Sequence, residues 1–384
     1  MIDKAISVFN EADPLVRNTH LCNTFLDFLL KAGRGVDGRK VLDEMLVKGS
    51  TFPPNDLTGF MFFDGLARRG KFVLPVKWEE VIGLVTKFGE HGVFPDALVL
   101  HKLITRLGRS GNVEHAWDLV HVLMKMSAPL EASCFNALLT GLGLESQFEK
   151  MNLLVSEMKE KGIKPDGITF GIRILYLCKS RRLGQAMEVL ESMKKEKENG
   201  GASVVPDLIA YNTVIKGLCQ VGRQEEGLVL VDKMISEHGY AANTITYNCL
   251  LDGFCKAGEI DRLRELFDQM NTEGVPADVI TLNILVDGMC KHGRISSAFE
   301  FFNDMQKKGL NANAITYTSL ISAFCNVNNL DKATAMFDLM VSSGCIPDKV
   351  VYYSLINGFS RAGRLDDACS VASKMKSKGF FLDA

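Results

Sequence analysis

Apolar residues occur along this chain in paired helical stripes. Between Thr244 and Asp278, positions spaced i, i+3, i+4, i+7 and i+8 form a first stripe: Tyr247, Leu250, Leu251, Phe254 and Cys255. A second stripe follows: Ile260, Leu263, Leu266, Phe267 and Met270. Gly258 lies between them, where a left-handed glycine commonly ends a helix. The pattern predicts a helical hairpin, and no alternation of strand type competes with it.

The same pattern returns about every 35 residues. "LNILVDGMCKHGRISSAFEFFNDM" begins 35 residues after "YNCLLDGFCKAGEIDRLRELFDQM". A hairpin of this length has too little core to fold alone, so the period predicts an all-α solenoid of stacked repeats. Residues 1–18 contain "IDKAISVFNEA", which matches the second helix of a truncated repeat. We divide the rest into ten repeats: 19–55, 56–96, 97–131, 132–166, 167–207, 208–243, 244–278, 279–313, 314–348 and 349–383.

Two repeats carry insertions. The repeat 56–96 contains "FVLPVK", whose proline predicts a loop between its helices. The repeat 167–207 contains "KEKENGGASVVPD", a polar stretch that predicts a protruding loop after its second helix. Neither end of the chain has a polar capping element, so we expect a segment of a longer array, with any targeting peptide upstream.

Composition narrows the functional classes only slightly. The chain has 44 Lys and Arg residues against 46 Asp and Glu residues. Any positively charged surface that binds nucleic acid must therefore be a local one. No apolar run reaches the length of a membrane span. Five of the ten cysteines recur at the same position of successive repeats: Cys178, Cys219, Cys255, Cys290 and Cys325. This regular spacing indicates small buried side chains rather than metal ligands or disulfides. We therefore expect a reducing compartment.

The sequence predicts neither an enzyme nor a metal or cofactor site. Its seven histidines share no helical face with cysteines or carboxylates at ligand spacing. It contains no glycine-rich phosphate loop and no H-x-E zinc signature. His115 and His121, near Trp117, are interpreted as surface or packing residues.

The repeat resembles a known family. "TYNCLLDGFCKAGEIDRLRELFDQMNTEGVPAD" is similar to the pentatricopeptide repeat of the pure, or P, class. The resemblance extends over essentially the whole chain and is weakest between Thr19 and Glu131. It implies a right-handed superhelix that binds single-stranded organellar RNA along its concave surface, one nucleotide per repeat. Such RNA is an mRNA, an intron or a ribosomal RNA, and no membrane is involved.

In this family the second residue of each repeat stacks on a base. The ten residues here are His20, Leu57, Leu98, Ser133, Ile168, Ile209, Ile245, Ile280, Ile315 and Val350. The six from Ile168 to Val350 form an unbroken aliphatic run. A stacking base needs such apolar faces. Ordinary core packing is the alternative explanation.

The family recognises the base edge with the fifth and the last residue of each repeat. Six pairs fit its pattern: Asn23 with Asn55, Asn136 with Asp166, Asn212 with Asn243, Asn248 with Asp278, Asn283 with Asn313, and Thr318 with Asp348. Four do not: Phe60 with Asp96, His101 with Glu131, Gly171 with Asp207, and Tyr353 with Asp383. By the family's code the chain favours Y-?-?-U-?-Y-U-Y-G-?, where Y is C or U. A role in starting a helix is the alternative for each Asn.

Phosphates require cations on the same face. Seven repeats have Lys or Arg two residues before the position of the helix-ending glycine: Lys31, Arg68, Arg109, Lys179, Lys256, Lys291 and Arg361. The helix dipole also favours a cation there, and both explanations can hold together.

Three functions follow from these observations. The first is sequence-selective RNA binding in organellar stabilisation, processing, splicing or translation. The second is a structural subunit of an organellar ribosome, with ribosomal proteins as partners. The third is a protein-binding scaffold. Between the organelles, the style of the "GFC" and "GMCK" motifs favours the mitochondrion, with the chloroplast as the alternative.

Overall fold

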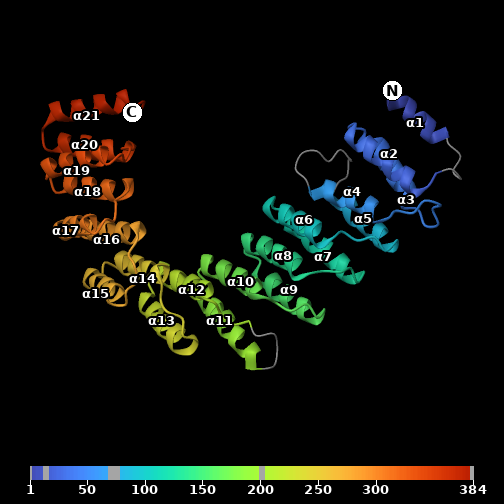
Figure 1. Ribbon diagram of the computed structural model, residues 1–384, viewed down its shortest axis with the longest axis horizontal. Coiled ribbons are helices and arrows are strands. Elements are labelled where there is room, and N and C mark those ends of the chain that lie inside the picture. The colour runs from blue at the N-terminus through green and yellow to red at the C-terminus, as the bar shows by residue number, and fades with distance from the viewer. Residues whose placement is uncertain (1, 12–16, 68–77, 199–203, 381–384) are drawn as a thin grey trace. The chain divides into compact units, whose positions relative to one another are not determined.

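The computed structural model describes residues 2–11, 17–67, 78–198 and 204–380. Every regular element in these stretches is an α-helix (Figure 1). The helices are α1 (Ile2–Glu11), α2 (Thr19–Lys31), α3 (Gly35–Met45), α4 (Asp56–Ala67), α5 (Trp78–Glu90), α6 (Ala97–Arg109), α7 (Val113–Lys125), α8 (Ala132–Leu144), α9 (Phe148–Glu160), α10 (Gly167–Lys179), α11 (Leu183–Glu198), α12 (Leu208–Gln220), α13 (Gln224–His238), α14 (Thr244–Ala257), α15 (Ile260–Thr272), α16 (Val279–Lys291), α17 (Ile295–Lys307), α18 (Ala314–Asn326), α19 (Leu330–Ser342), α20 (Lys349–Arg361) and α21 (Leu365–Ser377).

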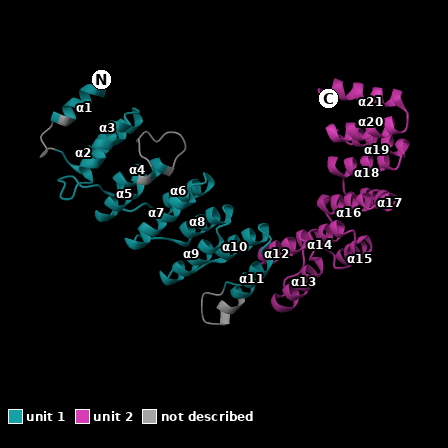
Figure 2. Cartoon of the chain, turned by 180° about the vertical axis from the view of Figure 1, so that it is seen from behind, with its two compact units in different colours: residues 1–206 teal, residues 207–384 magenta. Residues whose placement is uncertain are grey.

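The chain divides into two compact units, residues 1–206 and residues 207–384 (Figure 2). The typical hairpin, such as α14 with α15, packs its first helix against its second. Within each unit, the first helices of successive repeats also pack against one another. The all-α solenoid predicted from the sequence is therefore confirmed within each unit.

The first helices begin at capped positions. They are α2, α4, α6, α8 and α10 in the first unit and α12, α14, α16, α18 and α20 in the second. Their starting residues are also the starting residues of the ten repeats, and we keep that division as a proposed numbering. In nine of them the residue before the helix accepts a backbone N–H through its side chain: Asn18, Asn55, Asp96, Asp166, Asp207, Asn243, Asp278, Asn313 and Asp348. Each such cap contributes about 1 kcal/mol to helix stability.

The helix α1 packs against the first hairpin of the chain, α2 with α3. The Phe9 ring of α1 stacks on Phe25 of α2, with ring centroids 4.1 Å apart. Phe9 belongs to a buried cluster that also includes Leu29 of α2 and Met45 of α3. A second helix without a first helix of its own thus covers apolar surface of the repeat 19–55.

Small residues let the first helices approach closely. A Cβ atom placed on Gly288 of α16 would lie 2.5 Å from Sγ of Cys255 on α14. Gly253 and Gly358 face Cys219 and Cys325 in the same way. Four of the five cysteines that recur with the repeat are buried, as predicted, while Cys290 is half-buried. Burial raises the pKa of Cys255 to about 11, so the thiol stays protonated at neutral pH.

In one repeat the glycine and the larger residue occupy each other's positions. Tyr176 of α10 occupies the position that holds glycine in α14, α16 and α20, and it packs on Gly143 of α8. A Cβ on Gly143 would lie 2.3 Å from the Tyr176 ring. The large residue on one helix is therefore accommodated by a glycine on its neighbour, which keeps the interhelix volume filled.

One of the helix ends predicted from the sequence is confirmed, and another lies later in the chain. Gly258 ends α14 in the left-handed conformation, with φ of +78°, as predicted. The loop predicted from Lys195 begins later, because α11 continues to Glu198. Lys and Glu are good helix formers, and neither glycine nor proline interrupts them there. The "FVLPVK" insertion at 72–77 lies outside the described residues.

The contact between Gly288 and Cys255 gives a stability prediction. We expect Gly288→Ala to lower the free energy of unfolding by about 1–3 kcal/mol, because the added methyl group overlaps the Cys255 sulfur. Urea unfolding followed by circular dichroism measures this change. The control Gly83→Ala adds a methyl group to an exposed helical site with open space around it, and it should be neutral or stabilising. Cys255→Ala in the Gly288→Ala background should recover part of the loss; no recovery would contradict the assigned contact.

Candidate nucleic-acid interface

The fifth and last residues of a repeat are brought together at the start of the next first helix. Asn248 lies on α14, and Asp278 caps α16 thirty residues later in the chain. Asn248 Nδ2 donates to Asp278 Oδ1 at 3.2 Å. Thr281 of α16 joins both residues, because its hydroxyl donates to Asn248 Oδ1 at 2.7 Å and lies 2.9 Å from Asp278 Oδ1.

Three more predicted pairs repeat this contact. Nδ2 of the fifth residue lies 2.8 Å from Asn55 in the pair with Asn23, 3.2 Å from Asp166 in the pair with Asn136, and 3.5 Å from Asn243 in the pair with Asn212. In the pair of Asn283 with Asn313, the hydroxyl of Thr316 contacts both residues. The structure thus brings five of the six predicted recognition pairs together.

The network fixes which way each amide points. A carboxylate only accepts hydrogen bonds, so the Asn248 edge that faces Asp278 must be Nδ2 and the edge that faces Thr281 must be Oδ1. The same reasoning applies to Asn136, between Asp166 and Thr169. Each of these Asn side chains keeps a second Nδ2 hydrogen that a ligand can accept.

The aspartates of these pairs stay ionised. Burial acts to raise the pKa of Asp278, but hydrogen bonds from the backbone and hydroxyl of Thr281 and from Asn248 outweigh it and hold the pKa below the ordinary 3.8. The pKa of Asp166 is lowered against the effect of burial in the same way, by Thr169 and Asn136. At neutral pH both side chains are therefore acceptors.

The sixth pair is arranged differently. The Thr318 hydroxyl donates to the Ala314 carbonyl of its own helix at 2.7 Å. Asp348 caps α20 by accepting the Val351 N–H at 3.0 Å. Thr318 therefore bonds within α18 while Asp348 bonds only to α20, and the third residue of the following repeat is a valine.

The four irregular pairs show no common geometry. Phe60 is 49% exposed on α4, and Asp96 caps α6. His101 Nδ1 lies 3.0 Å from the Ser133 carbonyl oxygen, and His101 also lines a groove of about 260 Å³ together with Asn136, Ile168 and Arg109. Gly171 belongs to the first compact unit and Asp207 to the second. Asp383, the partner predicted for Tyr353, lies outside the described residues.

The aliphatic second residues are exposed. Their exposed fractions run from 54% for Val350 to 73% for Ile209, and the members are Ile168, Ile209, Ile245, Ile280, Ile315 and Val350. Each lies at the second position of a first helix, one residue before a buried third residue. Core packing, the alternative explanation, is wrong for all six. Five of them provide a spaced row of apolar surface on the second unit, and Ile168 lies on the first.

The predicted phosphate-binding cations that lie in the described stretches are exposed, and several have acidic neighbours that the sequence analysis missed. Lys31, Lys256 and Lys291 form ion pairs one helical turn back, with Asp27 at 2.6 Å, Asp252 at 2.5 Å and Asp287 at 2.6 Å. The hydrogen bond to Asp287 raises the pKa of Lys291. Such exposed pairs contribute only about 0.3–0.5 kcal/mol, so a phosphate can compete for the lysine.

The other cations have varied surroundings. Lys179 lies over the Tyr176 ring at 5.1 Å, and Arg361 donates to Asn326 at 3.3 Å. Arg109 lines the groove beside His101. Arg68 lies outside the described residues. The predicted basic row is thus interspersed with carboxylates rather than uniformly positive.

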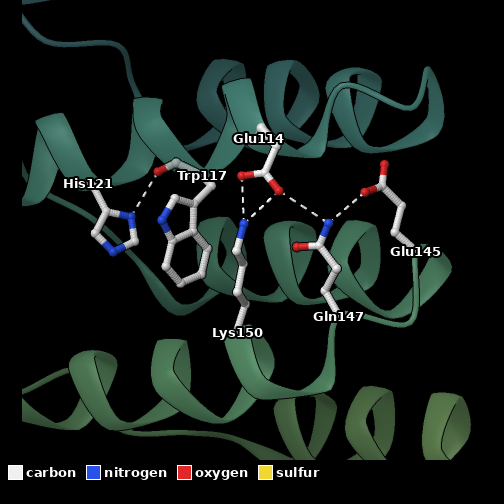
Figure 3. Close-up of polar contacts among 6 residues, drawn as sticks. All are labelled: Glu114, Trp117, His121, Glu145, Gln147 and Lys150. Atoms are coloured by element: carbon white, nitrogen blue, oxygen red, sulfur yellow. Dashed lines mark hydrogen bonds and ion pairs between the residues drawn. The ribbon is translucent and has the colours of Figure 1, made fainter.

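A separate polar cluster connects two second helices, α7 and α9 (Figure 3). Lys150 Nζ lies 2.6 Å from Glu114 and 5.5 Å from the centre of the Trp117 ring. His121 contacts the Trp117 carbonyl at 2.8 Å and Glu157 at 2.9 Å. These contacts connect neighbouring hairpins, in agreement with a surface or packing role for His121.

Comparison with known proteins places these features in a family. Models described as PPR repeat or PPR repeat family match more than half of the chain, at residues 20–50, 133–163, 168–197, 202–235, 242–291, 277–326, 313–361 and 350–380.

Two pentatricopeptide repeat-containing proteins of Arabidopsis thaliana, one of them described as mitochondrial, are each 40% identical over 54% of the chain. The chain spans 27% of the length of each. The crystal structure of the pentatricopeptide repeat protein PPR10 from maize has the same fold, with a TM-score of 0.50 and 22% identity over 98% of this chain and 56% of that one. The period, the capped first helices and these matches together show that the chain belongs to the pentatricopeptide repeat family.

Proposed function

We propose that this chain binds single-stranded RNA with sequence selectivity, one nucleotide per repeat, in organellar post-transcriptional RNA metabolism. The observation that carries the proposal is the recurring meeting of the fifth and last residues, which contact each other directly in four pairs. In these four and in a fifth pair, Asn283 with Asn313, the threonine of the next repeat donates to the fifth residue. A purely structural cap would need only the last residue. A buried Asn with a fixed amide is more than helix capping requires.

The hydrogen-bonding groups match pyrimidine edges. In the repeat 244–278, Asn248 offers an N–H and the ionised Asp278 offers an acceptor. Uracil presents the complement, a carbonyl oxygen beside the N3–H donor. In the repeat 208–243, Asn243 replaces the carboxylate with an amide, which can donate to N3 of cytosine or accept from N3 of uracil. This chemistry supports uracil for Asn with Asp and either pyrimidine for Asn with Asn.

Stacking and charge supply the remaining interactions. The exposed aliphatic second residues offer apolar faces for successive bases, and the exposed cations offer partners for phosphates. Relatives described as mitochondrial and as chloroplastic support an organellar location. We keep the mitochondrion as the proposed organelle.

The first test compares RNA sequences. We expect the 384-residue chain to bind 5′-CAAUACUCGA-3′, which matches the favoured pattern, at least about tenfold more tightly than an RNA with purines at its three C and two U positions, since each lost edge contact costs about 1 kcal/mol. Fluorescence anisotropy measures both affinities. Equal affinities would contradict selective readout and favour a structural RNA-binding subunit. Absence of binding at low salt would favour the protein scaffold.

Salt dependence tests the cations. Seven phosphate contacts predict a log–log slope of affinity against salt of about −5, at about −0.7 per contact. Changing Lys256 and Lys291 to Gln should make the slope shallower by about 1.4. The matched control changes Lys233 and Lys307, exposed lysines on the second helices α13 and α17, and should leave the slope unchanged. If the two pairs had equal effects, Lys256 and Lys291 would act only through the overall charge of the chain and not through specific phosphate contacts.

The last residue of a repeat tests the edge chemistry. We expect Asp278→Asn to abolish the preference for U over C at the seventh RNA position, because the amide can donate to cytosine N3 where the carboxylate cannot. The reciprocal change, Asn243→Asp, should create a preference for U at the sixth position. Affinities for RNAs that differ at one base measure both effects, and each variant is the control for the other.

The lowered pKa of Asp278 predicts an acid-side stability change. A carboxyl whose pKa is lower in the folded chain contributes stability above its ordinary pKa of 3.8, and this is lost as the pH falls through the folded value. Asp278→Asn lacks this titration. The wild type should therefore lose free energy of unfolding relative to the variant between about pH 5 and pH 3, as measured by urea unfolding. A constant difference across that range would contradict the lowered pKa.

A further inference from the structure

Five threonines share one position and one environment. Each is the third residue of a repeat and has no exposed surface: Thr58, Thr169, Thr246, Thr281 and Thr316. Each follows a repeat whose fifth residue is Asn: Asn23, Asn136, Asn212, Asn248 and Asn283. After the fifth residues Phe60, His101, Gly171 and Thr318, the third residue of the next repeat is Val99, Cys134, Ala210 and Val351, respectively. Within this chain, threonine at the third position thus accompanies Asn at the preceding fifth position.

The contacts explain this association. The hydroxyl donates to the Asn Oδ1 at 2.6 Å from Thr58, 2.7 Å from Thr169, 2.8 Å from Thr246 and 2.7 Å from Thr281. It also accepts the backbone N–H of the cap residue, for example from Asp278 at 3.1 Å. Because one lone pair of the hydroxyl oxygen is used by this N–H, the hydroxyl proton is directed toward the two side-chain oxygens.

The Asn amides need this donor. Asn23, Asn136, Asn212 and Asn248 are 2–8% exposed, so an Oδ1 without a partner would be costly. Rotating the amide would place Oδ1 of Asn248 against the Asp278 carboxylate, where two acceptors repel. The threonine therefore satisfies Oδ1 and keeps Nδ2 as the edge that is free to donate.

We propose that these five threonines are positioning residues that set the base preference of the preceding repeat. The inference rests on the proposed RNA-binding function. A base-reading unit then extends over two repeats: the fifth and last residues of one, and the buried third residue of the next. The threonine itself touches no RNA, since it has no exposed surface.

Fifth residues of other kinds have their own partners. His101 Nδ1 contacts the Ser133 carbonyl, and the Thr318 hydroxyl contacts the Ala314 carbonyl. Neither needs a hydroxyl from the following repeat, and Cys134 and Val351 stand there instead. The sequence therefore places the hydroxyl where an amide has to be oriented.

The loss experiment uses Thr281. Thr281→Val keeps the shape and removes the hydroxyl, whereas Thr281→Ser keeps the hydroxyl. We expect Thr281→Val to reduce the preference for U over G at the seventh RNA position by about tenfold, to leave the preference at the eighth position unchanged, and Thr281→Ser to retain most of it. An unchanged preference at the seventh position, or an equal loss for every RNA, would overturn the positioning role.

The gain experiment uses the repeat that lacks the arrangement. Thr318→Asn alone creates an Asn with Asp pair at the ninth RNA position. Thr318→Asn together with Val351→Thr adds the hydroxyl. The double variant should prefer U over G at that position about tenfold more strongly than the single variant. Equal preferences of the two variants would overturn the proposal.

A measurement without RNA separates this inference from the proposed function. In the chain labelled with ¹⁵N-asparagine, the Asn248 side-chain amide should exchange its protons about tenfold faster in Thr281→Val than in the wild type or Thr281→Ser. Unchanged exchange would overturn the positioning role whatever the RNA result. Faster exchange in a chain that binds no RNA would uphold the positioning role and reject RNA binding.

Discussion

The whole arrangement depends on the unsatisfied N–H groups at the start of each first helix. A helix leaves its first N–H groups without internal partners, and a side chain placed just before it commonly accepts one of them. In this chain that side chain is the last residue of the preceding repeat, as Asp278 shows at the start of α16. Because successive first helices pack side by side, the cap lies beside the fifth residue of its own repeat, Asn248 on α14. The requirement for capping thus places the two candidate recognition residues together.

The close approach of the first helices maintains this register. Glycine on one helix facing cysteine on the next brings α14 and α16 near enough for Thr281 to reach Asn248. The exchange of Gly143 and Tyr176 shows that the distance can be kept with other pairs of sizes. The interface between successive first helices therefore has two parts: apolar packing along the helices and polar contacts at their starts.

Much of this could be read from the sequence, and the limits have physical causes. The period and its stripes predict the hairpins, because each apolar position must face a neighbour in every repeat. The pairs such as Asn136 with Asp166 followed from the family's pattern, and their contact is seen in the structure. The acidic partners of Lys256 and Lys291 lie four residues earlier, a spacing at which side chains meet on a helix, so these ion pairs could be predicted from the sequence.

Other features could not be read so directly. The exposure of residues such as Ile245 was not decided by the sequence, because an aliphatic side chain at the start of a helix also suits core packing. The bridging role of Thr281 needs the distance between two repeats, so the threonine looks like an ordinary helix-start residue in the sequence. The matches to the family models stop at residue 50 and resume at residue 133. The repeats between these two matches carry Phe60 and His101 at the fifth position. There the helices are retained while the polar contact changes. The fold therefore requires less of the sequence than base recognition does, because any capped, well-packed hairpin can stack, whereas only a positioned amide can present one defined edge.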